Sequence, residues 1–299
     1  MKIDIEKALK NVPIVSLCDK NNDTYALMEK YNICGSIKAK VSYFMIKTAL
    51  KEGKLDKNKI LLEASSGNTA IALAYFGKIF DIKIKIILPT NTAICKKKLI
   101  TSYGAEIVEV EGITDDCIKY RDELYAQDKE KYFLPDQFTN YANFNAHYNL
   151  TGPRIEEELG TNLDFFCAGL GTSGTLLGTA KYLKQKNPNI KIIAINPIER
   201  VEGLRNFKTT KLKIPFYEEY KHLIDKVIDV SEEDIEIGLG LYLNRGYLVG
   251  LSSGAVLSGL TQYLKDKKGL KGCVIAPDGG DFYLDKVGNY VNMQNISCS

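Results

Sequence analysis

Short runs of apolar, β-branched residues alternate along the chain with longer stretches that have the periodicity of helices. Strands that are apolar on both faces and are separated by helices are typical of parallel sheets covered on both sides. The pattern therefore predicts an α/β protein, whose ligands bind beyond the carboxyl ends of the strands. The predicted strands cover residues 60–64, 82–88, 105–110, 164–168, 191–195 and 273–276, and the predicted helices cover residues 69–80, 175–186, 232–244 and 253–267.

The composition is that of an ordinary folded protein. The 299 residues are 45% hydrophobic and 26% charged, which is enough for one large or two modest domains. The 40 basic and 37 acidic side chains are interspersed and sum to a net charge of +3. This weak charge gives no basis for a nucleic acid or an anionic membrane as a partner.

The beginning of the chain and its cysteines indicate a cytoplasmic protein. Residues 1–13 lack the apolar stretch of a signal peptide, and no apolar run is long enough to span a bilayer. The 7 cysteines are an odd number and form no CxxC pair. We therefore expect reduced thiols, with no disulfide framework and no metal site.

The first of three unusual strand-to-helix turns reads Ser-Ser-Gly-Asn-Thr at residues 65–69. A helix N-terminus has exposed N–H groups and the positive end of the helix dipole, and both favour an anion such as a carboxylate. Helix capping alone accounts for one or two such polar residues. A run of five indicates a ligand site as well.

The second turn is rich in glycine and hydroxyl groups and reads Gly171, Thr172, Ser173, Gly174 and Thr175. Its glycines let the backbone approach a ligand, and its hydroxyl and N–H groups can surround a phosphate. With Gly169 the stretch also matches GxGxxG, the dinucleotide fingerprint, although the acidic residue expected after the next strand is missing. A phosphate site and a tight capped turn are both consistent with the residues alone.

The third turn ends on a lysine, Lys38, directly before a helical pattern over residues 39–50. The helix dipole disfavours a positive charge at this place. A partly buried lysine there gives up its proton more readily, which suits Schiff-base chemistry. Lys40 and Lys47 lie nearby, so an ordinary surface lysine is the alternative interpretation.

Taken together, the turns resemble the fold-type II pyridoxal-phosphate enzymes, specifically the cysteine synthase and cystathionine β-synthase family. The resemblance extends over nearly the whole chain, and six matches in the same order make chance negligible. The matching segments are NICGSIKAK (32–40), EASSGNTAIALA (63–74), DQFTNYANFNAHYNLTGP (136–153), AGLGTSGTLLG (168–178), VGLSSGA (249–255) and APDGGDFYL (276–284).

The resemblance implies a role for each matching residue. Lys38 carries pyridoxal 5'-phosphate as a Schiff base and acts as acid and base at the Cα atom of the substrate. Asn68 bonds the phenolate oxygen of the cofactor, and residues 171–175 hold its phosphate. The α-carboxylate of the substrate is bound by Ser65, Ser66, Gly67, Thr69 and Gln137.

The resemblance also implies a fold and a reaction. It predicts two parallel-sheet domains with helices on both faces: a smaller one at 36–149 that closes over the substrate, and a larger phosphate-binding one from 1–35 and 150–299. The reaction is β-replacement on a 3-substituted L-alanine, with sulfide as nucleophile or leaving group. Either cysteine is made from O-acetylserine or O-phosphoserine, or cysteine is consumed, releasing hydrogen sulfide and giving serine or a thioether. The partners are thus an amino acid and sulfide or a thiol, and a homodimer is expected.

Three places depart from the family pattern. Gly279 stands where a serine usually faces the pyridine nitrogen of the cofactor, so a water or a neighbouring hydroxyl replaces that serine or the nitrogen stays unpaired. Cys34 lies in the lysine segment and is either a buried thiol or a redox group. Arg205 and Asn206 replace part of a glycine-rich stretch, so we expect them to alter the entrance to the substrate site.

Several alternatives stay open. Asp225 belongs to a stretch that runs near the cleft in the family, so it either contacts the substrate amine or activates water, or is a surface residue. His147 is expected to be a hydrogen-bonded packing residue. For the whole chain, the alternatives are a dinucleotide-dependent oxidoreductase that uses GLGTSG, and a catalytically silent relative that binds amino acids or a partner protein.

Overall fold

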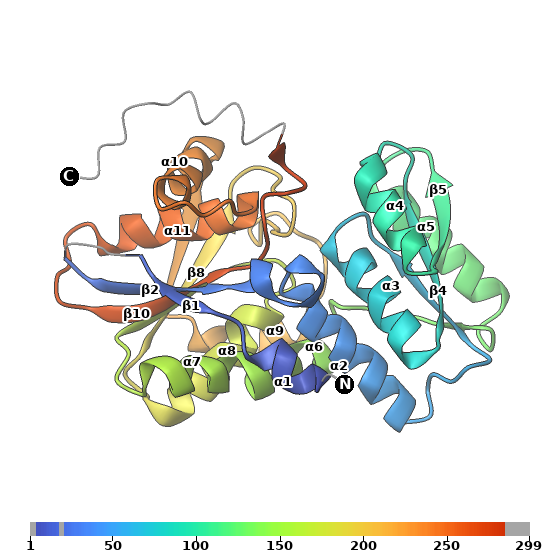
Figure 1. Ribbon diagram of the computed structural model, residues 1–299, viewed down its shortest axis with the longest axis horizontal. Coiled ribbons are helices and arrows are strands. Elements are labelled where there is room, and N and C mark those ends of the chain that lie inside the picture. Colours follow the sequence, from blue (N-terminus) through green and yellow to red (C-terminus); the bar gives the residue numbers. More distant parts are fainter. Residues whose placement is uncertain (1–3, 18–20, 285–299) are drawn as a thin grey trace. The chain divides into compact units, whose positions relative to one another are not determined.

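The computed structural model describes residues 4–17 and 21–284. The chain forms two compact units: the first comprises the segments up to Ile37 and from Phe144 onward, and the second runs from Lys38 to Asn143. Each unit has its own sheet of mainly parallel strands with helices beside it (Figure 1). This confirms the predicted α/β class with two parallel-sheet domains. The predicted domain limits at residues 36 and 149 lie a few residues outside those of the second unit.

The sheet of the first unit has six strands in the order β1-β2-β10-β7-β8-β9. β1 pairs antiparallel with β2, and the other neighbours are parallel. The carboxyl ends of the parallel strands therefore lie at one edge of the sheet. The strands are β1 (Ile14–Ser16), β2 (Asp23–Met28), β7 (Phe165–Gly169), β8 (Lys191–Pro197), β9 (Lys226–Val230) and β10 (Lys271–Ala276).

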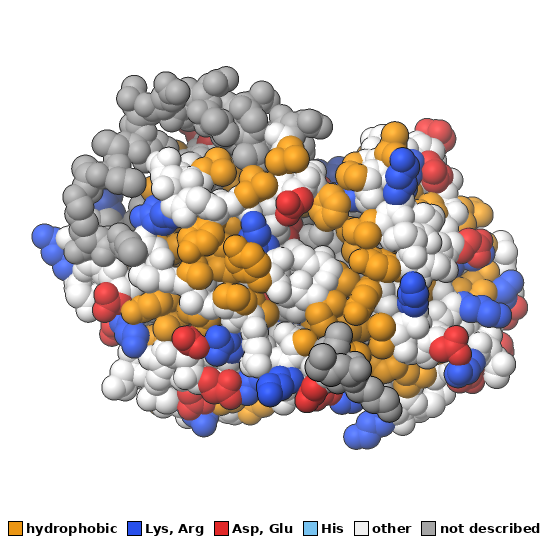
Figure 2. Space-filling model, in the orientation of Figure 1, with side chains coloured by type: hydrophobic (Ala, Val, Ile, Leu, Met, Phe, Trp, Pro, Cys, Tyr) orange, Lys and Arg blue, Asp and Glu red, His pale blue; other side chains and the backbone are white. Residues whose placement is uncertain are grey.

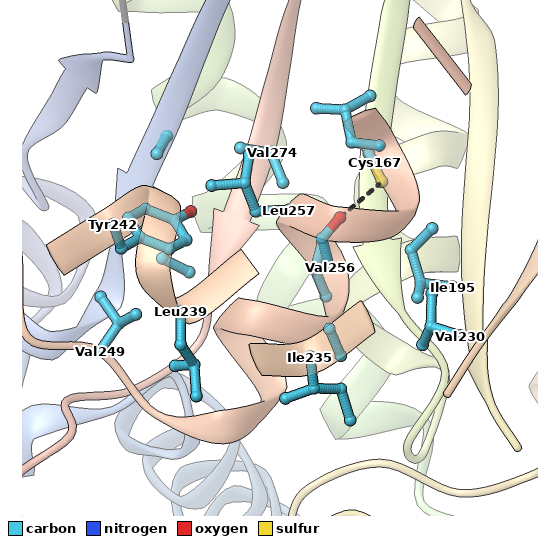
Figure 3. Close-up of a cluster of buried hydrophobic side chains, with 14 of the residues drawn as sticks. Cys167, Ile195, Val230, Ile235, Leu239, Tyr242, Val249, Val256, Leu257 and Val274 are labelled. Atoms are coloured by element: carbon cyan, nitrogen blue, oxygen red, sulfur yellow. Dashed lines mark hydrogen bonds between the residues drawn. The ribbon is translucent and has the colours of Figure 1, made fainter. Parts of the chain in front are cut away.

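Helices cover both faces of this sheet because its strands are apolar on both faces. On one face Ile195 and Val274 pack in one cluster with Leu239 and Val256 from two helices (Figure 3). On the other face Phe166 packs against a different pair of helices. The first pair is α10 (Glu232–Leu243) and α11 (Leu251–Leu264), and the second is α7 (Gly152–Leu159) and α8 (Gly174–Lys186).

The second unit has a four-stranded parallel sheet in the order β5-β4-β3-β6. Leu62 and Ile87 on one face pack with Cys117 of α5. α3 contacts β4, and α2 and α4 contact α3. The strands are β3 (Ile60–Ala64), β4 (Lys83–Pro89), β5 (Glu106–Val110) and β6 (Tyr132–Phe133), and the helices are α2 (Lys38–Lys51), α3 (Asn68–Phe80), α4 (Ile94–Ser102) and α5 (Thr114–Gln127).

The remaining described elements are short helical segments. They are α1 (Ile5–Lys10), η1 (Glu29–Tyr31), η2 (Ile33–Gly35), α6 (Tyr141–Ala146), the π-helical segment η3 (His147–Thr151), α9 (Pro215–Tyr220) and η4 (Lys221–Leu223). On the face drawn in Figure 2, basic and acidic side chains are interspersed rather than gathered by sign. Within residues 4–17 and 21–284, none of the helices has the length and apolar character needed to span a bilayer.

Candidate active site

The 65–69 turn lies between β3 and α3, as the sequence predicts. The N–H of Ser65 donates to the carbonyl of Ile87 on β4 at 3.0 Å, which ties the start of the turn to the sheet. α3 begins at Asn68 with Gly67 as its N-cap. Residues 65–68 are half-buried and Thr69 is buried. The turn therefore presents hydroxyl, amide and N–H groups at the positive end of a helix.

Gln137 comes to this turn from 68 residues further along the chain. The hydroxyl of Thr69 donates to Oε1 of Gln137 at 3.1 Å. Gln137 lies within a tight turn in which the carboxylate of Asp136 accepts from the N–H of Phe138 at 3.2 Å and from the hydroxyl of Thr139 at 2.5 Å. The structure thus brings two of the predicted carboxylate-binding residues together, with the amide nitrogen of Gln137 left as a donor.

Lys38 is the first residue of α2. Its side chain is half-buried, whereas Lys40 is fully buried. Lys47 is exposed, and its ammonium lies 5.6 Å from the centre of the Tyr43 ring. Of these three lysines, Lys38 alone combines a helix N-terminus with partial access to solvent.

The residues directly before Lys38 are bonded to the segment that follows β10. Ser36 forms an isolated bridge with Asp278, and the N–H of Ile37 donates to the carbonyl of Pro277 at 2.8 Å. The hydroxyl of Ser36 is buried and has no hydrogen-bond partner among the described residues. A buried hydroxyl without a partner is costly, so its place two residues before Lys38 marks this segment as one built to meet a ligand.

The 171–175 turn follows β7 and starts α8. Ser173 has a φ of 62°, an unusual left-handed conformation for a residue with a side chain. A Cβ atom at Gly171 would lie 2.5 Å from the carbonyl oxygen of Gly203, so only glycine fits beside this backbone. The N–H of Arg205 donates to the carbonyl of Leu170 at 2.7 Å. The 203–205 segment therefore packs closely along the turn.

His147 supports the 171–175 turn from the side. It is fully buried, its Nε2 lies 3.2 Å from the hydroxyl of Thr175, and its Nδ1 lies 3.0 Å from the hydroxyl of Thr151. This confirms the expectation of a hydrogen-bonded packing histidine. Its contact with Thr175 spans 28 residues of sequence and was not predicted.

Gly279 lies at the end of β10, where it is buried and forms an isolated bridge with Val249. A Cβ atom at this position would lie 2.6 Å from Oδ2 of Asp281. Because that oxygen is the movable end of a side chain, a serine fits only if Asp281 shifts. The neighbouring hydroxyl of Ser252 already donates to Asp278 at 3.0 Å.

Asp225 does not join the other predicted site residues of its unit. It precedes β9, accepts from the N–H of Ile192 at 2.9 Å, and pairs with Lys184 at 2.9 Å and Lys191 at 3.4 Å. Burial raises the pKa of its carboxyl, but the Ile192 N–H and the Lys184 ammonium outweigh burial and hold this pKa below the usual value. Lys191 and Ile192 lie at the amino end of β8 and Lys184 lies in the last turn of α8, whereas the 171–175 turn follows a carboxyl end. These contacts favour the alternative in which Asp225 is a surface residue, with its carboxylate joining the start of β8 to α8.

Cys34 and Asn206, which depart from the family pattern, have local environments that favour structural roles. Cys34 is half-buried with a φ of 59°, and burial raises the pKa of its thiol to about 12. Because the thiolate is the reactive form, this favours the buried-thiol interpretation over a redox role.

Asn206 donates to the carbonyl of Ile198 at 3.0 Å and accepts from the N–H of Lys208 at 2.8 Å. Its amide therefore braces its own loop.

Comparison with known proteins identifies the family. Residues 5–277 match the model of the family described as pyridoxal-phosphate dependent enzyme. The chain belongs to this family. The enzyme is 33% identical over 297 residues to cysteine synthase of Aquifex aeolicus, covering 94% of this chain and 90% of that relative. It is 30% identical over 293 residues to cysteine synthase B of Escherichia coli, covering 94% of each.

Solved structures agree with these relatives. A hydrogen sulfide-producing enzyme from Fusobacterium nucleatum matches with a TM-score of 0.86 and 31% identity, over 95% of this chain and 98% of that one. An O-acetylserine dependent cystathionine β-synthase from Helicobacter pylori matches with a TM-score of 0.83 and 30% identity, over 96% and 98% of the two chains. The enzyme is thus a pyridoxal-phosphate enzyme of the cysteine synthase and cystathionine β-synthase family, and the comparisons do not favour the dinucleotide interpretation.

The residues present fit this cofactor. The 171–175 turn offers N–H groups at the start of a 13-residue helix, where the helix dipole also favours a phosphate. Lys38 offers an amine for an aldehyde, and the unpaired hydroxyl of Ser36 lies close to it in sequence. Each of these groups of residues, taken by itself, therefore suits one end of pyridoxal phosphate.

Proposed function

We propose that the enzyme catalyses β-replacement on a 3-substituted L-alanine, with sulfide as the nucleophile or the leaving group. The observation that carries the proposal is the Thr69–Gln137 hydrogen bond at the N-terminus of α3. It brings the amide nitrogen of Gln137 beside the N–H groups at the helix start, and such donors suit an amino-acid carboxylate. The names of the relatives, cysteine synthases and a hydrogen sulfide-producing enzyme, support sulfide as the second reactant.

Most of the predicted site residues have a task in the proposed mechanism. When bound, pyridoxal phosphate supplies an electron sink that stabilises negative charge at the Cα atom of an amino acid. Residues 171–175 hold its phosphate, and the amide of Asn68 bonds its ring oxygen. The 65–69 turn and Gln137 bind the substrate carboxylate and thereby orient the Cα–H bond toward Lys38. The Nζ atom of Lys38 takes the Cα proton and returns it after the Cβ substituent has been exchanged.

Synthesis and consumption of cysteine use the same residues. In both, Lys38 moves one proton at Cα and the 65–69 turn holds one carboxylate, so these groups do not decide the direction. Asn206, one of the two residues expected to alter the substrate entrance, is engaged in its own loop. The donor amino acid must therefore be found by experiment.

The test is to mix the holoenzyme separately with O-acetylserine, O-phosphoserine, serine and cysteine. We expect at least one donor to change the absorbance of the cofactor and to lose its Cβ substituent, with sulfide released if that donor is cysteine. The matched control is Lys38→Ala, which should bind amino acids without turnover. A wild-type enzyme that releases no Cβ substituent from any donor would contradict the proposal and support the catalytically silent alternative.

The family resemblance also implies a homodimer, and we propose this assembly for the enzyme. Light scattering of the holoenzyme should then give twice the mass of one chain. A value equal to the mass of one chain at micromolar concentration would contradict it.

A further inference from the structure

A charged side chain, Glu63, lies in the buried end of β3, directly before the 65–69 turn. It is 3% exposed, and its Oε1 accepts from the N–H of Ala64 at 2.8 Å and from Nη1 of Arg121 at 3.2 Å. Its Oε2 is buried and has no hydrogen-bond partner among the described residues. A buried carboxylate with one oxygen unpaired is costly, so its presence in an otherwise apolar strand points to a use.

Arg121 connects this carboxylate to the surface of α5. Its side chain is 15% exposed, and its Nε and Nη2 donate to Oδ1 of Asp122 at 2.9 and 2.7 Å. Asp122 is exposed, so the same guanidinium has one partner inside the unit and another at its surface. Because a guanidinium stays charged at all ordinary pH values, Arg121 favours the ionised form of Glu63.

The segment that presents Gln137 lies close to the same charges. The charge of Asp136 acts on both Glu63 and Arg121, and Asp136 begins the turn that contains Gln137. The Glu63–Arg121 ion pair is therefore near the base of both segments that form the Thr69–Gln137 contact.

Glu63 changes its charge in the ordinary pH range. The elements that pack on β3 include α5, β4 and β6. α5 contributes Arg121, the segment after β6 contributes Asp136, and β4 places the uncharged Ile86 opposite Glu63. Burial raises the pKa of Glu63 to about 7, with Arg121 and the Ala64 N–H opposing that rise and Asp136 adding to it.

We propose that Glu63 and Arg121 are positioning residues for substrate binding: their ion pair fixes the base of the 65–69 turn and so sets its affinity for the substrate carboxylate. The inference rests on the proposed function, in which that turn binds the carboxylate. Ionised Glu63 holds the Ala64 N–H, one residue before Ser65, whose own N–H is bonded to β4. Protonated Glu63 is a weaker acceptor, so both of its bonds weaken and the start of the turn gains freedom.

The kinetic test compares three variants of the holoenzyme. Glu63→Gln keeps the size of the side chain without its charge, and Arg121→Met keeps the aliphatic stem without the guanidinium. Both should raise KM for the donor about tenfold while kcat changes less than about threefold, the pattern for loss of uniform substrate binding. The control Asp122→Asn removes only the surface partner of Arg121 and should leave KM unchanged. In the wild type KM should rise as the pH falls from 8 to 6, and Glu63→Gln should remove that rise.

A second readout does not depend on which donor reacts. Hydrogen exchange of the amides at residues 64–69 and 136–140 is measured in the holoenzyme without substrate. After correction for intrinsic rates, exchange should be faster in Glu63→Gln and Arg121→Met, unchanged in Asp122→Asn, and faster in the wild type at pH 6 than at pH 8.

These readouts separate the two claims. If the variants lower the melting temperature but leave KM and turn exchange at wild-type values, the pair is only structural and the inference is overturned. If no donor reacts with the wild type, the proposed function fails, while the exchange data still decide whether Glu63 and Arg121 position the turn. Should the variants not fold, the wild-type pH comparison of turn exchange decides alone, and equal exchange at pH 6 and pH 8 overturns the inference.

Discussion

The two ligand-binding turns have the same local plan but different supports. Each follows a buried parallel strand, β3 or β7, and each starts a helix of 13 residues. The 171–175 turn is supported by close packing and one side-chain contact: the backbone of Gly203 packs against Gly171, and His147 bonds Thr175. The 65–69 turn is supported by charges, because Glu63 and Arg121 pair at its base.

This difference matches the ligands that we propose for the two turns. A cofactor stays bound through many turnovers, and a close-packed support suits a ligand that is not exchanged. A substrate must bind and leave in each turnover, and a support that includes a titrating carboxylate lets pH adjust its affinity. Substitutions in the two turns and their supports test this contrast.

Gly171→Ala should disable the 171–175 turn. The new Cβ would lie 2.5 Å from the carbonyl oxygen of Gly203. The backbone fixes the position of this Cβ, and the oxygen belongs to the backbone, so no side-chain rotation can relieve the strain. We expect the affinity for pyridoxal phosphate to fall about 100-fold, which corresponds to about 3 kcal/mol of overpacking. Cofactor titration of the apoenzyme measures this, with thermal unfolding as the control for folding. Wild-type affinity would show that the turn does not hold the phosphate.

Glu63→Gln should change how stability depends on pH. Burial raises the pKa of Glu63 to about 7 in the folded protein from an ordinary value of 4.5, so its favourable contribution is complete below pH 4.5 and is lost as the pH rises through 7. The wild type should therefore lose up to about 3 kcal/mol between pH 4.5 and pH 8 that Glu63→Gln does not lose. Urea unfolding at several pH values measures the difference. Parallel curves for the two proteins would contradict a raised pKa.

Thr69→Val and Thr175→Val form a matched pair, since each removes one hydroxyl without changing side-chain size. Thr69→Val loses the bond to Gln137 and should raise KM for the donor about tenfold while leaving cofactor affinity unchanged. Thr175→Val loses the contact with His147 and should weaken cofactor binding first. Steady-state kinetics and cofactor titration of both variants separate the effects. The reverse pattern would exchange the roles of the two turns.

Asp225→Asn should have the smallest effect. Its carboxylate joins Lys184 and Lys191 near the amino ends of the strands and is 27% exposed. We expect kcat/KM to stay within about twofold and the free energy of unfolding to fall by about 1 kcal/mol, as for a partly exposed ion pair. A large loss of kcat with normal stability would restore the catalytic interpretation.

The position of Asp225 relative to the sheet could not be predicted from the sequence alone. The strand β9 was not among the predicted strands, and its register pairs Lys226 with Ile193 near the beginning of β8. Only this pairing reveals that the preceding Asp225 lies at the amino ends of the parallel strands. Local patterns place the 65–69 and 171–175 turns correctly, because each turn directly follows an apolar run that the sequence itself marks.

The local sequence pattern does not predict contacts between segments that are distant in the chain. His147 contacts Thr175 from a π-helical segment, and residue periodicity does not predict such a segment. Glu63 did leave a signal, since it is the charged residue in the otherwise apolar run Ile-Leu-Leu-Glu-Ala. Its partner Arg121 lies 58 residues away on a helix with many charged residues, so only the packing of α5 on β3 identifies the pair.

The central claim is that Lys38 carries the cofactor. The direct measurement is to reduce the holoenzyme with borohydride, digest it and map the pyridoxyl label by mass spectrometry. The account predicts one labelled lysine, Lys38, and no label on its neighbours Lys40 and Lys47. A label on any other lysine, or no label on the peptide that contains Lys38, would contradict it.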